Sequence, residues 1–198
     1  GAASDTRLVR GFVSSNAGSS YVLTSQGKLA VNDIANWTSN LQQLPDAALA
    51  RIPDAAGSLA APAIVTSKGN NLSYFVHDGE RRVIQTSNMA TEFLDLLRQP
   101  KPIELPLSAI NSIPNSGNAF APGVLVRSQN SSQLFLVDDL TRKIRMPSEA
   151  QAKAQINAPV FTLSRSDLDA LTTRTGFNSL KVICDGNGYL LDDGTLYP

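Results

Sequence analysis

A fourfold internal repeat constrains the fold of this 198-residue chain more than any other feature of its sequence. A β-prone apolar run, a short turn and a second β-prone run recur, with Gly27 and Gly79 lying 52 residues apart. Asp78 and Asp138 lie 60 residues apart, and Asp138 and Asp192 lie 54 apart. The four predicted hairpins are residues 21–31, 74–84, 134–144 and 189–197. Repeats of this length are typical of units that cannot bury their apolar surface alone, so we expect neighbours to cover one another.

Glycine-containing turns define the hairpins. Gln26-Gly27 and Asp78-Gly79 interrupt apolar runs, and glycine adopts the positive φ of a tight turn without steric cost. The third copy has Asp138-Asp139 there and no glycine, so a longer turn is expected. A further β-prone run and a polar turn precede each hairpin, which predicts a three-stranded antiparallel meander. The preceding runs are residues 7–9, 63–66, 124–127 and 180–183.

Two helical signals follow each complete hairpin. Ile34, Trp37 and Leu41 share one face of a helix, and the same spacing recurs in residues 89–97. Ser148-Glu149-Ala150-Gln151 has the form of a capping box, in which the serine oxygen and the glutamine side chain satisfy free helix-start amides. Second, shorter helices are predicted after a Leu-Pro or Leu-Ser start in residues 44–53, 105–114 and 163–171.

The predicted fold class is therefore α+β, with tandem repeats of a short antiparallel β-meander plus one or two short helices, in about three and a half copies. Residues 1–6 are expected to be an N-terminal edge or a flexible segment. The predicted repeats are residues 7–60, 61–119 and 120–176, with a partial fourth at 177–198. The spacing leaves open whether they form a ring, a stack or a pseudo-twofold pair.

Charge and composition exclude several classes of function. Seventeen basic and seventeen acidic residues give a net charge of zero, and no basic cluster marks a nucleic-acid-binding face. The single cysteine, Cys184, forms no intrachain disulfide. One cysteine, few lysines and many Ser, Asn, Ala and Thr residues favour a secreted bacterial protein at the cell surface or envelope over a cytosolic one. No apolar run approaches the roughly 20 residues of a transmembrane helix, so no membrane insertion is expected within this segment. The first residues look like the edge of a longer protein from which a targeting segment has been removed.

No catalytic residue, metal site or cofactor is predicted. His77 is the sole histidine and sits at a hairpin tip without a nucleophile motif, so a structural or exposed role is expected. Cys184 follows β-branched residues, which favours a buried thiol. The acidic turns, Asp138-Asp139 and Asp192-Asp193, recur at one place in the repeat, and turn chemistry explains them better than a glycosidase pair or a calcium loop.

Recurring aromatic residues and one arginine pair are the candidate binding residues. Aromatic rings can stack on sugars, although at alternating strand positions they more often belong to the core. Trp37, on the apolar helix face, is expected in the core. The candidates are Tyr21, Tyr74, Phe75, Arg81, Arg82 and Tyr189.

The second unit, with Tyr74-Phe75-Val76-His77-Asp78-Gly79 followed by Glu80-Arg81-Arg82-Val83-Ile84, resembles a known type of repeat. It is similar to tandem β-hairpin/helix repeats of secreted actinobacterial cell-wall proteins. It is distantly similar to the periplasmic repeats of the B-type core component of mycobacterial type VII secretion systems. The resemblance implies an envelope location and a binding or scaffolding role, and carries over no catalytic residues.

Three functions remain open. The leading hypothesis is a non-catalytic extracytoplasmic binding module that recognises cell-envelope glycan or an envelope protein. The alternative is a structural subunit of an envelope or secretion assembly. The third is a hydrolase with an unrecognised site.

Overall fold

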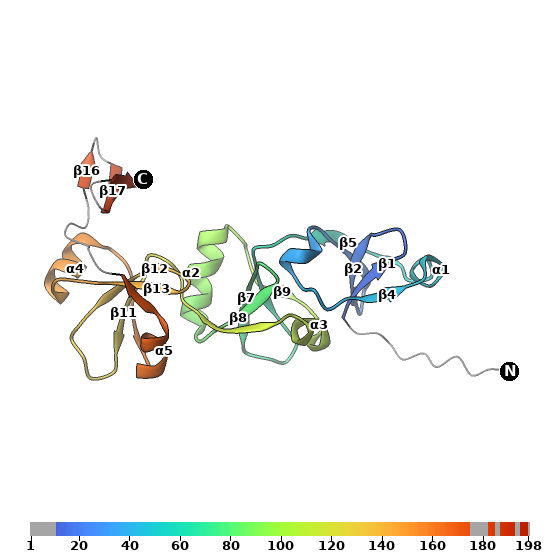
Figure 1. Cartoon of the computed structure of the whole chain (residues 1–198), viewed down its shortest axis with the longest axis horizontal. Coiled ribbons are helices and arrows are strands. Elements are labelled where there is room, and N and C mark those ends of the chain that lie inside the picture. Colours follow the sequence, from blue (N-terminus) through green and yellow to red (C-terminus); the bar gives the residue numbers. More distant parts are fainter. Residues whose placement is uncertain (1–10, 175–181, 185–186, 193–194, 198) are drawn as a thin grey trace. The chain divides into compact units, whose positions relative to one another are not determined.

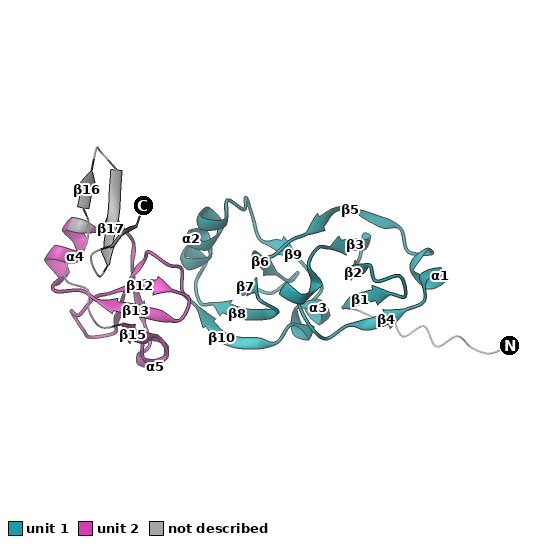
Figure 2. Cartoon of the chain, turned by 45° about the horizontal axis from the view of Figure 1, so that its top comes forward, with its two compact units in different colours: residues 1–119 teal, residues 120–198 magenta. Residues whose placement is uncertain are grey.

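Three sheets of the same topology dominate the structure. The computed structural model describes residues 11–174 and the backbone of three strands at 182–184, 187–192 and 195–197. The chain forms two compact units, residues 1–119 and 120–198 (Figure 2). The described strands form three five-stranded sheets and one three-stranded sheet. The predicted α+β class, with repeated β-meanders and short helices, is confirmed (Figure 1).

Each five-stranded sheet has an antiparallel meander at its centre and a parallel strand at each edge. Sheet 1 has the order β4-β1-β2-β3-β5, with β1 Phe12–Ser15, β2 Ser20–Thr24, β3 Gly27–Val31, β4 Gln42–Leu44 and β5 Asp54–Leu59. Sheet 2 contains β6 Ala63–Thr66, β7 Ser73–His77, β8 Glu80–Ile84, β9 Ile103–Glu104 and β10 Asn115–Ala119. Sheet 3 contains β11 Leu125–Ser128, β12 Phe135–Asp139, β13 Arg142–Arg145, β14 Val160–Leu163 and β15 Thr172–Arg174. Sheet 4 contains β16 Val182–Cys184, β17 Asn187–Asp192 and β18 Thr195–Tyr197.

The parallel edge strands explain where the helices lie. A parallel pair of strands requires a crossover connection. Each five-stranded sheet and its connections, which we call a module, has two crossovers. One runs from the meander to the first edge strand, and the other runs from that strand to the opposite edge strand. The first crossover carries η1 Ile34–Asn36 in module 1, α2 Ser87–Leu97 in module 2 and α4 Glu149–Gln155 in module 3. The second carries α1 Asp46–Leu49, α3 Leu107–Ser112 and α5 Arg165–Ala170. Each module is thus one sheet and its two crossovers.

Side chains alternate between the two faces of each sheet. In module 2, Phe93 of α2 is fully buried and stacks on Phe75 of β7 at 5.1 Å between ring centroids. We call this side the long-helix face. The other side, which carries Tyr74 of β7, is covered by α3 and is the short-helix face. The corresponding residues of sheet 1 are Val22 on the long-helix face and Tyr21 on the short-helix face.

The first helix is reduced to a single 3₁₀ turn in module 1. In modules 2 and 3 a hydroxyl caps the helix: Thr86 Oγ1 accepts from the Met89 amide and Ser148 Oγ from the Gln151 amide, both at 3.1 Å. Asp33 takes the same place in module 1, with φ 48° and no capping bond from its side chain. The predicted helix over Ile34, Trp37 and Leu41 is therefore wrong beyond Asn36, because residues 36–40 are weak helix formers that lack a cap.

The missing helix changes how module 1 is buried. In module 3 the sheet residues Leu125, Leu136 and Ile144 form a core with Ala152 of α4. In module 1 the corresponding face is covered by module 2 instead, and Trp37 is fully buried in a cluster that both modules share. The expectation that neighbours cover one another thus holds for modules 1 and 2, whereas module 3 closes its own long-helix face.

The hairpin turns differ in detail from the prediction. The third turn is not longer but consists of two residues, Leu140 and Thr141, after a register shift between Val137 and Asp139. The Asp139 carboxylate accepts from the Thr141 amide at 2.8 Å and replaces the missing glycine as the turn-forming residue. Burial acts to raise the pKa of Asp139, but the hydrogen bonds from Thr141 and Arg142 and the charge of Arg142 outweigh it and lower that pKa.

The edge strands were not predicted, and the first meander starts later than expected. β4, β5 and β10 consist largely of Gln, Asn, Asp, Ser, Gly and Ala rather than β-prone residues, and β9 is only two residues long. The strand predicted at residues 7–9 lies outside the described residues, and β1 begins at Phe12.

Candidate functional site

An aromatic ring and a cation recur together on the short-helix face of each module. Lys28 Nζ lies 5.8 Å from the ring centroid of Tyr21. Arg81 lies 5.1 Å from the ring of Tyr74, and Lys143 lies 5.5 Å from the ring of Phe135. In each of the three five-stranded sheets, the cation lies two residues before the residue that pairs with the aromatic residue on the neighbouring strand. The pair is therefore a property of the repeat.

The cation of each pair also ties the second helix to the sheet. Lys28 Nζ donates to the carbonyl of Ile52 at 2.8 Å, just after α1, and forms an ion pair with Asp54 at 2.7 Å. Lys143 Nζ donates to the carbonyl of Leu168 at 2.6 Å and to that of Leu171. Arg81 Nη1 reaches the Asn111 side chain of α3 at 3.3 Å. Carbonyls at a helix C-terminus lack intrahelical partners and attract a cation, so these contacts stabilise the module. We call this contact the cation anchor.

Lys143 shows the anchor in its most buried form. The residue is 5% exposed, and burial lowers the pKa of its ammonium group, an effect that the charge of Asp169 partly offsets. The two carbonyl acceptors compensate for the water that the ammonium group loses.

Replacing Lys143 by methionine is expected to lower the free energy of unfolding by about 2 kcal/mol, because charge-assisted hydrogen bonds are lost while the aliphatic volume is retained. Urea denaturation followed by circular dichroism measures the change. Lys153→Met, at a 57% exposed side chain, is the matched control and is expected to cost less than about 0.5 kcal/mol. Equal losses in the two variants would contradict an anchoring role for Lys143.

The structure places three of the predicted binding residues, Tyr21, Tyr74 and Arg81, in these aromatic–cation pairs. Tyr74 and Phe75 are each 6% exposed. Arg82 Nη1 donates to the carbonyl of Ser116 at 2.8 Å. Tyr21 is half-buried and lines a groove. Several sequence predictions concern side chains that the structure does not describe. They are those of Tyr189, of Cys184 and of the turns at residues 185–188 and 192–194.

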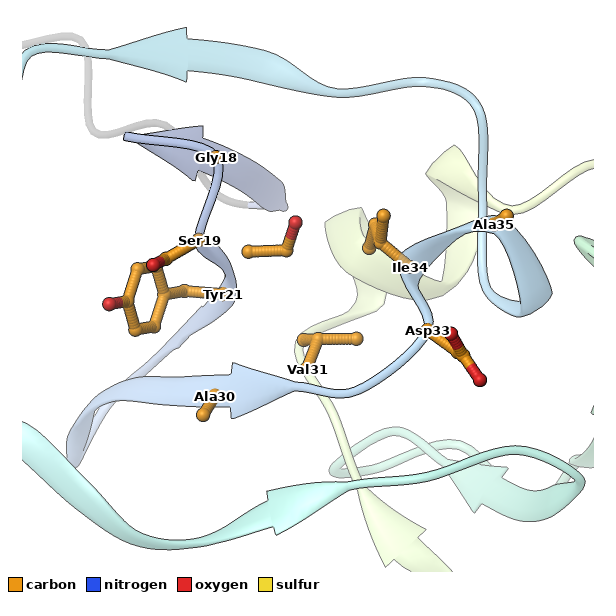
Figure 3. A pocket seen from close by; sticks show the side chains of 9 residues that line it. Gly18, Ser19, Tyr21, Ala30, Val31, Asp33, Ile34 and Ala35 are labelled. Carbon is orange, nitrogen blue, oxygen red and sulfur yellow. The ribbon is translucent and has the colours of Figure 1, made fainter. Parts of the chain in front are cut away.

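Two grooves occupy equivalent places in modules 1 and 2. The first encloses about 490 Å³ between the start of β2, the end of β3 and η1 (Figure 3). The second encloses about 220 Å³ at the start of α2. Equivalent lining residues are Ser20 and Ser73, Val31 and Ile84, and Asp33 and Thr86. In module 3 the serine is replaced by Leu134, which is buried with Met146.

The grooves offer hydrogen bonds rather than reactive groups. The side chains that line the module 2 groove are hydroxyls, amides and aliphatic groups, including Asn71, Gln85 and Thr91, and none of them is charged. The module 1 groove adds the Asp33 carboxylate and the Tyr21 phenol. Such a lining suits an uncharged polar ligand.

His77 and the acidic residues have local roles. The His77 side chain is 42% exposed, lies 3.4 Å from the Asp78 carboxylate and meets the edge of the Phe75 ring, as expected for a structural position. Asp138 forms ion pairs with Arg142 and Arg174. Among the described residues, no three His, Cys, Asp or Glu side chains come close enough to hold a metal ion. No helix in that part of the chain has the length and apolar character needed to cross a bilayer.

No protein-family model matches the chain, and neither does any curated protein. Among solved structures, it is similar to a chain of the periplasmic assembly from the ESX-5 inner membrane complex, with 13% identity and a TM-score of 0.24. That match covers 89% of this chain and 62% of the other. A chain of an intact ESX-5 inner membrane complex matches with 14% identity and a TM-score of 0.24, over 85% of this chain and 52% of that one. The chain thus spans less than two thirds of either relative, and no function follows from so low a likeness.

Proposed function

We propose that the chain is a non-catalytic structural subunit of a cell-envelope assembly, in which the modules act as a scaffold for protein contacts. The supporting observation is the cation anchor. The recurring cations Lys28, Arg81 and Lys143 are bonded inside their own modules, where they hold helix ends to sheets. Their recurrence in all three modules therefore reflects a demand of the architecture rather than of a ligand.

The exposed residues are those of a protein-contact surface. Leu41, Leu72, Leu96 and Leu107 of unit 1 are 36–57% exposed. The polar composition and the resemblance of the second repeat to envelope repeats support a location outside the cytoplasm. An envelope protein is the partner class that these features favour.

The grooves of modules 1 and 2 favour a second candidate, recognition of envelope glycan. Sugar hydroxyls match the hydroxyl groups that line both grooves and the side-chain amides of the module 2 groove, and the Tyr21 ring lies at the module 1 groove. This function would use two equivalent sites on unit 1 and none of the anchoring cations.

Sedimentation with envelope material distinguishes these two functions. The purified chain is expected to co-sediment with native envelope fragments and to remain in solution with protease-stripped peptidoglycan. Tyr21→Ala and Ser73→Ala test the two grooves, and Asp95→Ala, at an exposed position of α2 outside both grooves, is the control. Binding to stripped peptidoglycan that falls at least about fivefold in a groove variant alone would replace the scaffold proposal with glycan recognition.

A further inference from the structure

We infer that the short-helix face of module 1 is a docking surface for the apolar sheet face of a different protein. The inference rests on the proposed function and names the partner chemistry. The sites that carry it are Tyr21 and Leu23 of β2 and Ala48 and Ile52 at α1.

The contact between modules 1 and 2 shows what covers such a face. The short-helix face of module 2 shares one buried cluster with the long-helix face of module 1: Tyr74, Val76, Ala109 and Ile113 on one side, and Phe12, Val22 and Trp37 on the other. The Thr38 hydroxyl and the Asn40 amide group add hydrogen bonds to the Ser112 carbonyl at 2.8 and 2.9 Å. A sheet face that lacks its own long helix is thus the natural cover for a short-helix face.

The same surface exists on module 1 without a cover among the described residues. Equivalent positions of the two modules follow from equivalent strand pairs, Lys28 with Asp54 in module 1 and Arg81 with Asn115 in module 2. Val76, Ala109 and Ile113 are at most 1% exposed, and Tyr74 is 6% exposed. Their counterparts are less buried: Tyr21, Leu23 and Ile52 are half-buried and Ala48 is exposed. The short-helix faces of modules 1 and 2 therefore carry similar residues and differ in how far these are buried.

Module 3 differs at the corresponding positions. Asp167 stands where modules 1 and 2 have Ala48 and Ala109. Arg145 stands where module 1 has Ala30. Charged side chains would lose water on docking, whereas the two alanines of module 1 permit close approach of an apolar surface. The groove at Tyr21 and Ala30 leaves about 490 Å³ beside this surface for an inserted side chain (Figure 3).

The contact between modules 1 and 2 indicates the chemistry of the partner. Module 1 presents aliphatic strand residues and the Trp37 ring to module 2, so the partner is expected to present a strand with alternating apolar residues and an aromatic side chain. Within the described residues a second copy offers no such face, because module 2 covers that of module 1 and α2 and α4 cover the others. Since the long-helix faces of sheets 1 to 3 are covered in this way, we assign the partner to a different protein, and a second copy bound through its sheet 4 is an outcome that the test distinguishes.

Photocrosslinking in the native envelope tests the inference. p-Benzoylphenylalanine in place of Tyr21 keeps a ring near Lys28 and reacts with whatever lies on this face. The expected adduct joins the benzophenone at position 21 to a peptide of another protein. Mass spectrometry is expected to map it to a peptide in which apolar residues alternate and which contains an aromatic residue. Ala48→Asp is expected to lower the adduct yield about tenfold or more, because docking would bury an unpaired carboxylate.

Ala50→Asp is the matched control. It makes the same change two residues further on, where the counterpart Asn111 of module 2 is exposed, and is expected to change the yield less than about twofold. No adduct from Tyr21, an adduct to a second copy, to lipid or to glycan, or a yield unaffected by Ala48→Asp would each overturn the inference. Benzophenone in place of Leu96 distinguishes the docking inference from the scaffold function. Protein adducts at position 96 but not at position 21 would overturn the inference and leave the scaffold function standing. The absence of protein adducts at both positions would overturn the scaffold function too.

Discussion

Replacing Trp37 by alanine is expected to lower the free energy of unfolding of unit 1 by about 3–5 kcal/mol, the cost of emptying a fully buried aromatic site. Trp37 is 0% exposed and packs against Phe12 at 5.8 Å between ring centroids. It follows the 3₁₀ turn that replaces the long helix and belongs to the core that modules 1 and 2 share. The cavity would therefore weaken both modules.

Hydrogen exchange measured by mass spectrometry distinguishes this shared core from a local one. Protection is expected to fall in both β2 and β7 of the Trp37→Ala variant. Phe93→Ala is the matched control, because Phe93 is equally buried but packs from α2 against Phe75 of its own module. Faster exchange in β2 and unchanged exchange in β7 of Trp37→Ala would contradict a core that the two modules share.

The sequence predicted the parts of the fold that carry their own local signals. Meander strands alternate or continue in apolar residues, α2 shows the apolar spacing of a helix, and the start of α4 has the capping hydroxyl of Ser148. The edge strands of sheets 1 and 2 escaped prediction because pairing with a meander, and not propensity, makes them strands, whereas β14 and β15 of sheet 3 contain β-prone residues and were missed. β10 has the sequence Asn-Ser-Gly-Asn-Ala and is extended because β8 supplies its hydrogen-bond partners.

The cation anchor could have been predicted in part from the sequence. Aligning the repeats on Tyr21 and Tyr74 brings Lys28 and Arg81 into one column, whereas Lys143 joins them only when the extra residue of the third hairpin, at the register shift between Val137 and Asp139, is allowed for. Arginine in the second repeat and lysine in the others concealed the pattern, and Arg81 was grouped with Arg82 as a binding pair instead. The sequence could not show which carbonyls these cations reach, because the bonds of Lys28 to Ile52 and of Lys143 to Leu168 depend on how α1 and α5 lie on their sheets.

The loss of one helix couples the first two modules. Where α2 or α4 is present, a module covers its own long-helix face, and where only η1 is present, the next module must do so. Small changes at a helix start, such as Asp33 in place of the capping Thr86, therefore decide whether neighbouring modules share a core. The same logic makes a helix-deficient sheet the expected partner of the free short-helix face of module 1.

Gly27 is a position where the reason for glycine differs from the predicted one. The two residues of the turn are Ser25 and Gln26, and Gly27 is the first residue of β3, with φ 130°. A Cβ atom at Gly27 would lie 2.2 Å from the Pro53 carbonyl oxygen, which accepts from the Lys28 amide at 2.9 Å. Glycine is needed here because β5 begins against the backbone of β3, in addition to the positive φ.

Gly27→Ala is accordingly expected to lower the free energy of unfolding by about 3–4 kcal/mol, the sum of a backbone clash and a strained φ. Gly18→Ala is the control, because Gly18 also has a positive φ, 89°, but its Cβ would meet nothing within 4 Å. That variant should lose only about 1–2 kcal/mol, the cost of the left-handed conformation alone. Urea denaturation of both variants measures the difference, and equal losses would mean that turn geometry, and not the approach of Pro53, selects glycine at this position.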